Sequence, residues 1–146
     1  MKSFGSYSYE LAMAFVKAEE TLRLKAYKCP KGVWTIGWGH TGGVKEGDTC
    51  TKAQADAWIR SDLQSAQTAL AKYINVSVSE SQFIALLSLA YNLGAQGVVD
   101  KCPKMLRALN AKDNDGAAEE FLDVTNGGLA GLVARRRREA DLMRKC

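Results

Sequence analysis

The chain has 146 residues, of which 47% are hydrophobic and 25% charged, with a formal net charge of +4 and one histidine. These values are typical of a single compact globular domain and argue against an intrinsically disordered chain. No apolar run approaches the roughly 20 residues of a membrane-spanning helix, and the first residues lack the regions of a secretory signal. We therefore expect no stable membrane insertion.

Helical spacing dominates the chain. Leu11, Ala14, Phe15 and Ala18 recur at helical intervals and predict a first helix that ends near Glu20. Capping boxes predict the starts of two longer helices, and three further helices follow from apolar spacing. The boxes are Thr51–Gln54 and Ser79–Gln82, and the helix that starts at the second box stops at Gly94. Of the three further helices, one begins at Pro103, one lies around 117–122 and one spans 129–143.

Residues 22–41 have a different pattern. Short alternating runs flank the turn signal Pro30-Lys31-Gly32 and predict a small antiparallel sheet. The expected fold is α+β and predominantly helical, a single domain over 1–146. It has a sheet lobe at about 21–45, a helical lobe at about 50–146 plus the N-terminal helix, and a cleft between them.

The four cysteines, Cys29, Cys50, Cys102 and Cys146, lie far apart and form no C-x-x-C pair. This spacing does not support a zinc site, and we expect neither a metal nor an organic cofactor. Free thiols are expected in a cytosolic setting, whereas disulfides could form after release into an oxidising space. The sequence does not define which cysteines would pair.

Glu20 is a candidate general acid. The negative end of the helix dipole disfavours its carboxylate, so the side chain should hold its proton to higher pH, as an acid catalyst requires. The alternative is an ordinary solvated glutamate beside Glu19. Cys29 and Thr35 flank the predicted turn and would lie on the sheet edge that faces Glu20.

These residues carry a family resemblance. The segment Glu20-x8-Cys29-x5-Thr35, followed by Ile36-Gly37-Trp38-Gly39-His40, resembles the catalytic signature of phage-type lysozymes, glycoside hydrolase family 24. The resemblance resumes at Tyr91-Asn92-Leu93-Gly94 and again at 131–136 with Glu139, and it spans about Met13 to Met143. It implies a lysozyme-like fold and an endolysin, a muramidase that cleaves the β-1,4 bond between N-acetylmuramic acid and N-acetylglucosamine in peptidoglycan.

The resemblance implies that Glu20 protonates the departing oxygen while Thr35 and residue 29 hold the attacking water, giving inversion. The family more often has Asp where this chain has Cys29. A free thiol is mostly neutral at pH 7, although Lys28 and Lys31 would favour the thiolate. Three interpretations stay open: a thiolate acting as base or nucleophile, a thiol that orients water, or an altered mechanism. Thr21 also departs from the family's glycine, so the turn there is expected to differ.

Further site residues follow. The resemblance implies a buried structural pair of His40 with Asp62, whose loss should lower stability and leave the chemistry intact. It also implies that Arg136 pairs with Glu20. Tyr91 and Asn92, at a helix end that borders the cleft, and Thr41, just beyond the sheet, are expected to contact the substrate.

The run 135–138 of four arginines cannot face one nucleic-acid groove, because successive helical residues are about 100° apart. We expect no nucleic acid as a partner and at least one arginine directed at the core or cleft. The expected partner is peptidoglycan, reached by a monomer that stays in the host cytoplasm until a separate holin releases it at lysis. The rival functions are a lytic transglycosylase, which needs no water-activating carboxylate, and a non-catalytic peptidoglycan-binding module.

Overall fold

The computed structural model describes residues 1–145. Over this range the fold is a predominantly helical α+β arrangement, as predicted. The α-helices are α1 (Met13–Glu19), α2 (Lys52–Ala71), α3 (Glu80–Leu93), α4 (Ala95–Lys101), α5 (Pro103–Asn110), α6 (Asn114–Phe121) and α7 (Ala130–Met143). The strands are β1 (Lys2–Ser3), β2 (Arg23–Lys28), β3 (Trp34–Gly37) and β4 (Ser77–Val78), and two 3₁₀ helices, η1 (Phe4–Ser6) and η2 (Tyr9–Ala12), precede α1.

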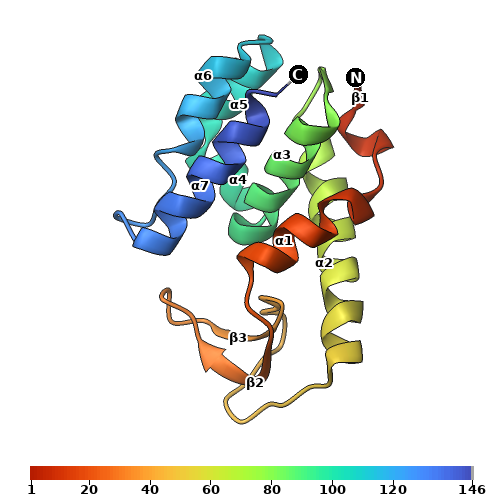
Figure 1. Cartoon of the computed structure of the whole chain (residues 1–146), viewed down its shortest axis with the longest axis vertical. Helices are drawn as coiled ribbons and strands as arrows, with labels where there is room; N and C mark the ends of the chain where they lie inside the picture. Colours follow the sequence, from red (N-terminus) through yellow and green to blue (C-terminus); the bar gives the residue numbers. More distant parts are fainter. Residues whose placement is uncertain (146) are drawn as a thin grey trace.

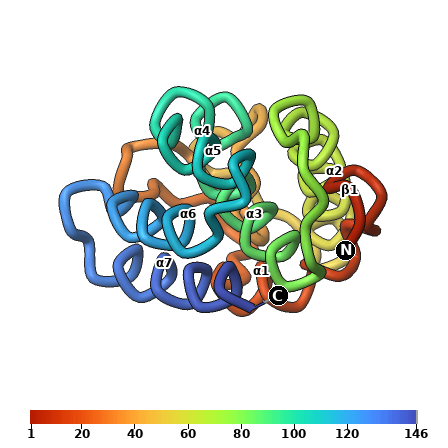
Figure 2. Tube along the Cα trace, turned by 90° about the horizontal axis from the view of Figure 1, so that it is seen from above, coloured from red at the N-terminus to blue at the C-terminus, as the bar shows by residue number. Residues whose placement is uncertain are grey.

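Helix α3 forms the centre of the helical part. It runs through the middle of the bundle, with α2 on one side and α6 and α7 on the other (Figure 2). Both predicted capping boxes are present at the starts of α2 and α3. The α3 helix ends at Gly94, whose φ of +77° suits a residue without a side chain. Apart from the half-buried Ile84, its apolar residues from Phe83 to Ala90 are almost completely buried, so α3 supplies much of the hydrophobic core.

Strands β2 and β3 form the predicted hairpin at the end of the molecule opposite the two chain termini (Figure 1). Gly32 makes the turn with a φ of +78°, and Cys29 closes it through backbone hydrogen bonds to Val33 and Gly32. Pairing between the two strands is interrupted after Arg23, because the middle of β2 pairs instead with residues 48–50. Cys29 thus lies at the turn of the hairpin, directly after β2.

Asp56 of α2 ties this hairpin to the helices. Its carboxylate accepts a hydrogen bond from Trp38 Nε1 at 2.8 Å and pairs with Lys17 of α1 at 3.2 Å and Lys52 at 3.1 Å. Trp38 follows β3 directly, so the Asp56 side chain links the sheet to both α1 and α2. This contact fixes the position of the hairpin relative to the end of α1, where Glu20 lies.

The prediction of which face of the first helix is buried is wrong. Ala12 and Val16 are completely buried, whereas Leu11 is 42% exposed and Ala14 and Ala18 lie at the surface. The cause is the 3₁₀ segment Tyr9–Ala12, which has about three residues per turn and shifts the phase of the α-helix that follows. The predicted end of the helix at Glu20 is confirmed.

Helix α4 and strands β1 and β4 escaped prediction because they are short. Helix α4 starts directly after Gly94 and buries only Val98, so its seven residues show no repeating apolar pattern. Strands β1 and β4 have two residues each, too few to show an alternating pattern in the sequence. Within residues 1–145 no single helix is long and apolar enough to cross a membrane; α3 and α4 pass that test only as a pair bent by 95°.

Candidate active site

Glu20 lies where α1 ends and the chain turns toward the sheet. Its backbone is extended, with φ −102° and ψ 129°, so its side chain leaves the helix axis and enters the space between helices and hairpin. Oε1 accepts a hydrogen bond from Arg135 Nη1 at 2.7 Å, and the side chain is 18% exposed. Thr21 needs no left-handed conformation because the helix ends in this extended residue, which accounts for the departure from glycine.

The arginine that pairs with Glu20 is Arg135, so the expected pairing with Arg136 is wrong. Consecutive residues of α7 point about 100° apart. Arg135 reaches Glu20 at the end of α1 and Ser88 of α3, whereas Arg136 donates to Asn92 Oδ1 at the end of α3, at 2.7 Å. Both guanidinium groups are buried, which confirms that part of the arginine run faces the core and cleft.

The neighbouring Glu19 has a separate partner. Arg138 donates to both of its carboxylate oxygens, from Nε at 2.6 Å and from Nη2 at 2.5 Å. The Arg138 side chain is 53% exposed but that of Glu19 only 6%, so the arginine reaches from the surface to a largely buried carboxylate. The two adjacent glutamates therefore have different surroundings, and Glu20 is the one directed into the cleft.

Gly39 leaves room for the Glu20 carboxylate. A Cβ added at Gly39 would lie 3.0 Å from Glu20 Oε2, and the residue has a φ of +92° that side chains rarely adopt. The carboxylate is thus held by Arg135 on one oxygen and lies against a bare backbone near the other. In the sequence Gly39 stands out only as part of the family motif, and its contact with Glu20 depends on the fold.

We expect Gly39→Ala to lower kcat/KM by at least about 10-fold, because displacing a reacting group by as little as about 1 Å has large kinetic effects. The added methyl group would push the Glu20 carboxylate aside. Gly43→Ala is the matched control: Gly43 has a φ of +71°, but a Cβ there meets nothing within 4 Å. Similar losses of thermal stability with a kinetic defect in Gly39→Ala alone would support the contact, and equal kinetics in the two variants would contradict it.

Cys29 and Thr35 face Glu20 from the hairpin. Tyr27 is paired across the sheet with Thr35, and residues two apart on a strand share a face, which places Tyr27, Cys29 and Thr35 on one side. All three line a single cleft with Glu20. Thr35 is 4% exposed and its hydroxyl donates to the Val33 carbonyl at 3.0 Å.

The Cys29 thiol has a pKa below its ordinary value. Burial raises this pKa, but it is outweighed by hydrogen bonds from the backbone amides of Val33 and Lys31, by the Thr35 hydroxyl and by the charge of Lys31. Of the two lysines expected to favour the thiolate, Lys31 is the one among the main causes, and Lys28 Nζ lies over the Trp34 ring, 5.4 Å from its centroid. The site therefore favours a thiolate at residue 29.

The three expected substrate-contacting residues, Thr41, Tyr91 and Asn92, also line this cleft. Tyr91 donates its hydroxyl to the Trp38 carbonyl at 2.5 Å, so α3 is joined to the loop after β3, and its ring is what borders the cleft. Burial, followed by the negative charge of Glu20, raises the pKa of Tyr91 and of Tyr27. Both phenols therefore stay neutral, and the proton of the Tyr91 hydroxyl is donated to Trp38.

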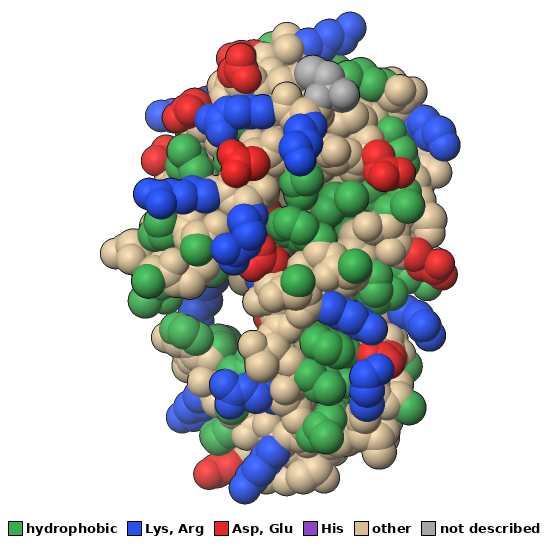
Figure 3. Space-filling model, viewed as in Figure 1, with side chains coloured by type: hydrophobic (Ala, Val, Ile, Leu, Met, Phe, Trp, Pro, Cys, Tyr) green, Lys and Arg blue, Asp and Glu red, His purple; other side chains and the backbone are tan. Residues whose placement is uncertain are grey.

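Several cleft residues were not predicted: Tyr27, Pro30, Lys31, Asn126, Leu129 and Leu132. Strand alternation provides a signal for Tyr27, since it lies two residues before Cys29. Asn126 has a φ of +48° and lies in the loop before α7, and no sequence pattern places that loop beside the hairpin. Figure 3 shows the indentation between the helical part and the hairpin part of the molecule.

His40 makes the expected contact with Asp62. Its Nδ1 lies 2.7 Å from Asp62 Oδ2 and its Nε2 lies 3.1 Å from the Gly42 carbonyl. The ring stacks on Trp58 of α2, with centroids 4.7 Å apart and planes 8° apart. The pair is half-buried rather than buried, with the Asp62 side chain 34% exposed. His40 thus connects the loop after β3 to α2.

We expect Asp62→Asn to lower the free energy of unfolding by about 1–2 kcal/mol, the contribution of a charge-assisted hydrogen bond, and Tm by a few degrees. The hydrolysis rate at a temperature where the variant is folded should stay within about twofold of the parent. Calorimetry and an activity assay on the same preparation check this. A loss of activity of 100-fold in folded protein would instead place His40 in the chemistry.

Comparison with known proteins decides the family. The family model for phage lysozyme matches residues 17–139. The chain belongs to the phage lysozyme family. It is 36% identical over 140 residues to the endolysin of Acyrthosiphon pisum secondary endosymbiont phage 1, covering 91% of this chain and 94% of that protein. It is also 36% identical over 120 residues to the SAR-endolysin of Enterobacteria phage P21, covering 80% of this chain and 72% of that protein.

Structural comparison agrees. The endolysin from Escherichia coli O157:H7 phage FAHEc1 superimposes with a TM-score of 0.80 at 30% identity, over 95% of this chain and 94% of that one. The phage lysozyme described here is thus a glycoside hydrolase that acts on peptidoglycan. It is a muramidase endolysin that cleaves the β-1,4 bond between N-acetylmuramic acid and N-acetylglucosamine, and its target is the bacterial cell wall.

Proposed function

We propose that Glu20 is the general acid of this muramidase and that Cys29, assisted by Thr35, activates the attacking water. The observation that carries the proposal is the shared cleft, where a carboxylate fixed by Arg135 faces a thiol whose surroundings favour the thiolate. These side chains supply both proton transfers, so the mechanism uses no metal or organic cofactor.

In the proposed reaction, Glu20 gives its proton to the glycosidic oxygen as the bond to the sugar C1 breaks. A water molecule on the opposite face of the sugar forms the new bond to C1 and gives a proton to the Cys29 thiolate, which inverts the anomeric centre. The Thr35 hydroxyl can turn its proton from the Val33 carbonyl to the Cys29 sulfur while it accepts a hydrogen bond from the water. Proton exchange with solvent restores both groups.

Mass spectrometry of the sugar ends released from purified peptidoglycan tests the role of the water. Reducing N-acetylmuramic acid ends are the expected product. Anhydro-muramic ends would mean that Glu20 acts without an activated water, as in a lytic transglycosylase, and the roles of Cys29 and Thr35 would then be wrong. Binding of the wall without any cleavage would contradict the whole assignment.

We further propose that Thr41, Tyr91 and Asn92 bind the glycan on either side of the bond that is cut. The cleft continues beyond Glu20 into a second hollow, which shares Lys31, Asn126 and Leu132 with it and ends between α4, α5 and α6. This length suits a polymeric substrate better than a single sugar. Truncated muropeptides should therefore be cut more slowly than intact glycan strands.

Release and assembly form a separate proposal. We propose that the chain acts as one catalytic unit and as a monomer, and that it stays in the host cytoplasm until a separate holin opens the membrane. The relative from phage P21 is named a SAR-endolysin, and release without a holin is the alternative route. Expression in Escherichia coli with and without a co-expressed holin separates the two routes. Lysis without the holin would contradict the proposed route, and ultracentrifugation checks the monomer.

A further inference from the structure

A cluster of three charged side chains lies behind the cleft, between α3 and α7. Arg135 is 5% exposed, and Arg136 and Glu139 are 0% exposed. Burial lowers the pKa of Arg136 and raises that of Glu139, and the attraction between the two groups opposes both effects. Enclosing charges in this way is costly, and hydrophobic side chains of similar size often give equal stability. The mechanism above uses one contact of Arg135 and leaves Glu139 without a role.

Glu139 contacts both arginines at their Nε atoms. Its Oε2 accepts hydrogen bonds from Ser88 Oγ at 2.5 Å and from Arg135 Nε at 3.3 Å. Its Oε1 lies 3.0 Å from Arg136 Nε, an ion pair without the geometry of a hydrogen bond. The two guanidinium groups therefore share one carboxylate, and their outer nitrogens extend away from it toward the cleft.

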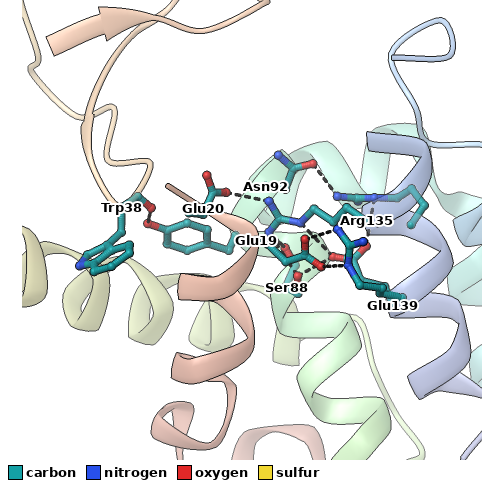
Figure 4. Close-up of polar contacts among 10 residues, drawn as sticks. Glu19, Glu20, Trp38, Ser88, Asn92, Arg135 and Glu139 are labelled. Carbon is teal, nitrogen blue, oxygen red and sulfur yellow. Dashed lines mark hydrogen bonds and ion pairs between the residues drawn. The ribbon is translucent and has the colours of Figure 1, made fainter. Parts of the chain in front are cut away.

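Each outer nitrogen reaches a different cleft residue. Arg135 Nη1 donates to Glu20 Oε1 and Arg136 Nη2 donates to Asn92 Oδ1, both at 2.7 Å. Figure 4 shows Arg135 between Glu20 on one side and Glu139 on the other, with Ser88 beside Glu139. Glu20 and Asn92 both line the cleft. One buried carboxylate is therefore connected to two cleft residues through two parallel paths.

The second path fixes the chemistry that Asn92 offers. A guanidinium group only donates hydrogen bonds, so the Asn92 amide must face Arg136 with its oxygen. Its NH₂ group is then the part available to a ligand. An amide fixed in this orientation recognises an acceptor, such as the carbonyl oxygen of an N-acetyl group or of a peptide.

We propose that Glu139 is a positioning residue for glycan cleavage, which holds Arg135 so that Glu20 is fixed and holds Arg136 so that the Asn92 NH₂ group faces a substrate carbonyl. This inference rests on the roles proposed above for Glu20 and Asn92. Ser88 assists by binding both Glu139 and Arg135. Because Glu139 serves both paths, its loss affects both kcat, through Glu20, and KM, through Asn92.

The test is a double-mutant cycle with Glu139→Gln and Asn92→Ala in the full chain, assayed on purified peptidoglycan. Glutamine keeps the shape but lacks the charge and directs an NH₂ group at one guanidinium. We expect Glu139→Gln to lower kcat/KM by roughly 10-fold or more, with a higher KM and a lower kcat. Asn92→Ala should raise KM in the parent but have little further effect in the Glu139→Gln background, since the amide is already misoriented.

A purely structural role gives a different result. Glu139→Gln would then lower Tm while the effects of the two substitutions on kcat/KM multiplied, and that outcome overturns the inference. An Asn92→Ala variant with the parent's KM also overturns the path through Asn92. Loss of activity in Glu139→Gln is distinguished from failure of the proposed general acid, because Glu20→Gln tests the acid separately. Glu119→Gln is the matched control: it removes an exposed 2.7 Å pair with Arg144 and should leave the kinetics unchanged.

A second variant keeps the inference testable if Glu139→Gln does not fold. Arg136→Lys retains a positive charge for Glu139 but has one charged nitrogen, which cannot contact both Glu139 and Asn92. KM should rise several-fold with kcat nearly unchanged, because the path from Glu139 through Arg135 to Glu20 is intact. An unchanged KM in the folded variant would refute the path through Arg136.

Discussion

Replacing Glu20 by glutamine is expected to reduce peptidoglycan hydrolysis by about 10²–10⁴-fold, the usual contribution of a positioned general acid. The amide cannot donate a proton to the glycosidic oxygen. Its oxygen can still accept the hydrogen bond from Arg135, so the free energy of unfolding should change by no more than about 2 kcal/mol. Rates of release of reducing ends, together with thermal unfolding, measure both quantities.

Glu19→Gln is the matched control for Glu20→Gln. The two glutamates are adjacent at the end of α1, and each pairs with an arginine of α7. The Glu19 side chain is 6% exposed and binds Arg138 through two hydrogen bonds, so its loss should cost about 1–3 kcal/mol of stability. The rate of the folded variant should stay within about twofold of the parent. Equal activity losses in the two variants would show that the effect comes from the end of the helix and not from the acid. An active Glu20→Gln would remove the general acid from Glu20 altogether.

The sequence predicted the position of Glu20 at the end of the first helix well, because two independent signals converge there. The first helix had to stop near Glu20, and the turn at Pro30-Lys31-Gly32 had to place Cys29 and Thr35 at a hairpin edge. Local periodicity and turn chemistry determine both features. The family motif then related the helix end to the hairpin across the cleft.

The arginine that pairs with Glu20 could not be predicted in the same way. Choosing between Arg135 and Arg136 requires the rotation of α7 to within one residue, and four consecutive arginines provide no apolar marker for that rotation. The burial of Glu139 was equally hidden, since a glutamate on a helix is ordinarily solvated. Contacts between distant elements decide these points, as they do for Gly39 and Glu20.

Substitutions at Cys29 are expected to have the second large effect. If the thiolate is the base, Cys29→Ala should lower the rate by about 10²-fold or more, and Cys29→Ser should be no better, because a serine hydroxyl stays neutral at neutral pH. Cys29→Asp should keep substantial activity, since a carboxylate is an adequate base. Rates measured from pH 4 to pH 9 on purified peptidoglycan compare the four proteins.

The pH dependence of the rate distinguishes a thiolate base at residue 29 from the alternatives. The pKa of Cys29 lies below its ordinary value, so the thiolate, and with it the rate, should increase as pH rises through that pKa and be lost below it. In Cys29→Asp the corresponding loss should move to lower pH, because a carboxyl group ionises near pH 4. Parental activity in Cys29→Ser with an unshifted profile would mean that residue 29 only orients water. Parental activity in Cys29→Ala would remove it from the mechanism and leave Glu20 to act alone, the chemistry of a transglycosylase.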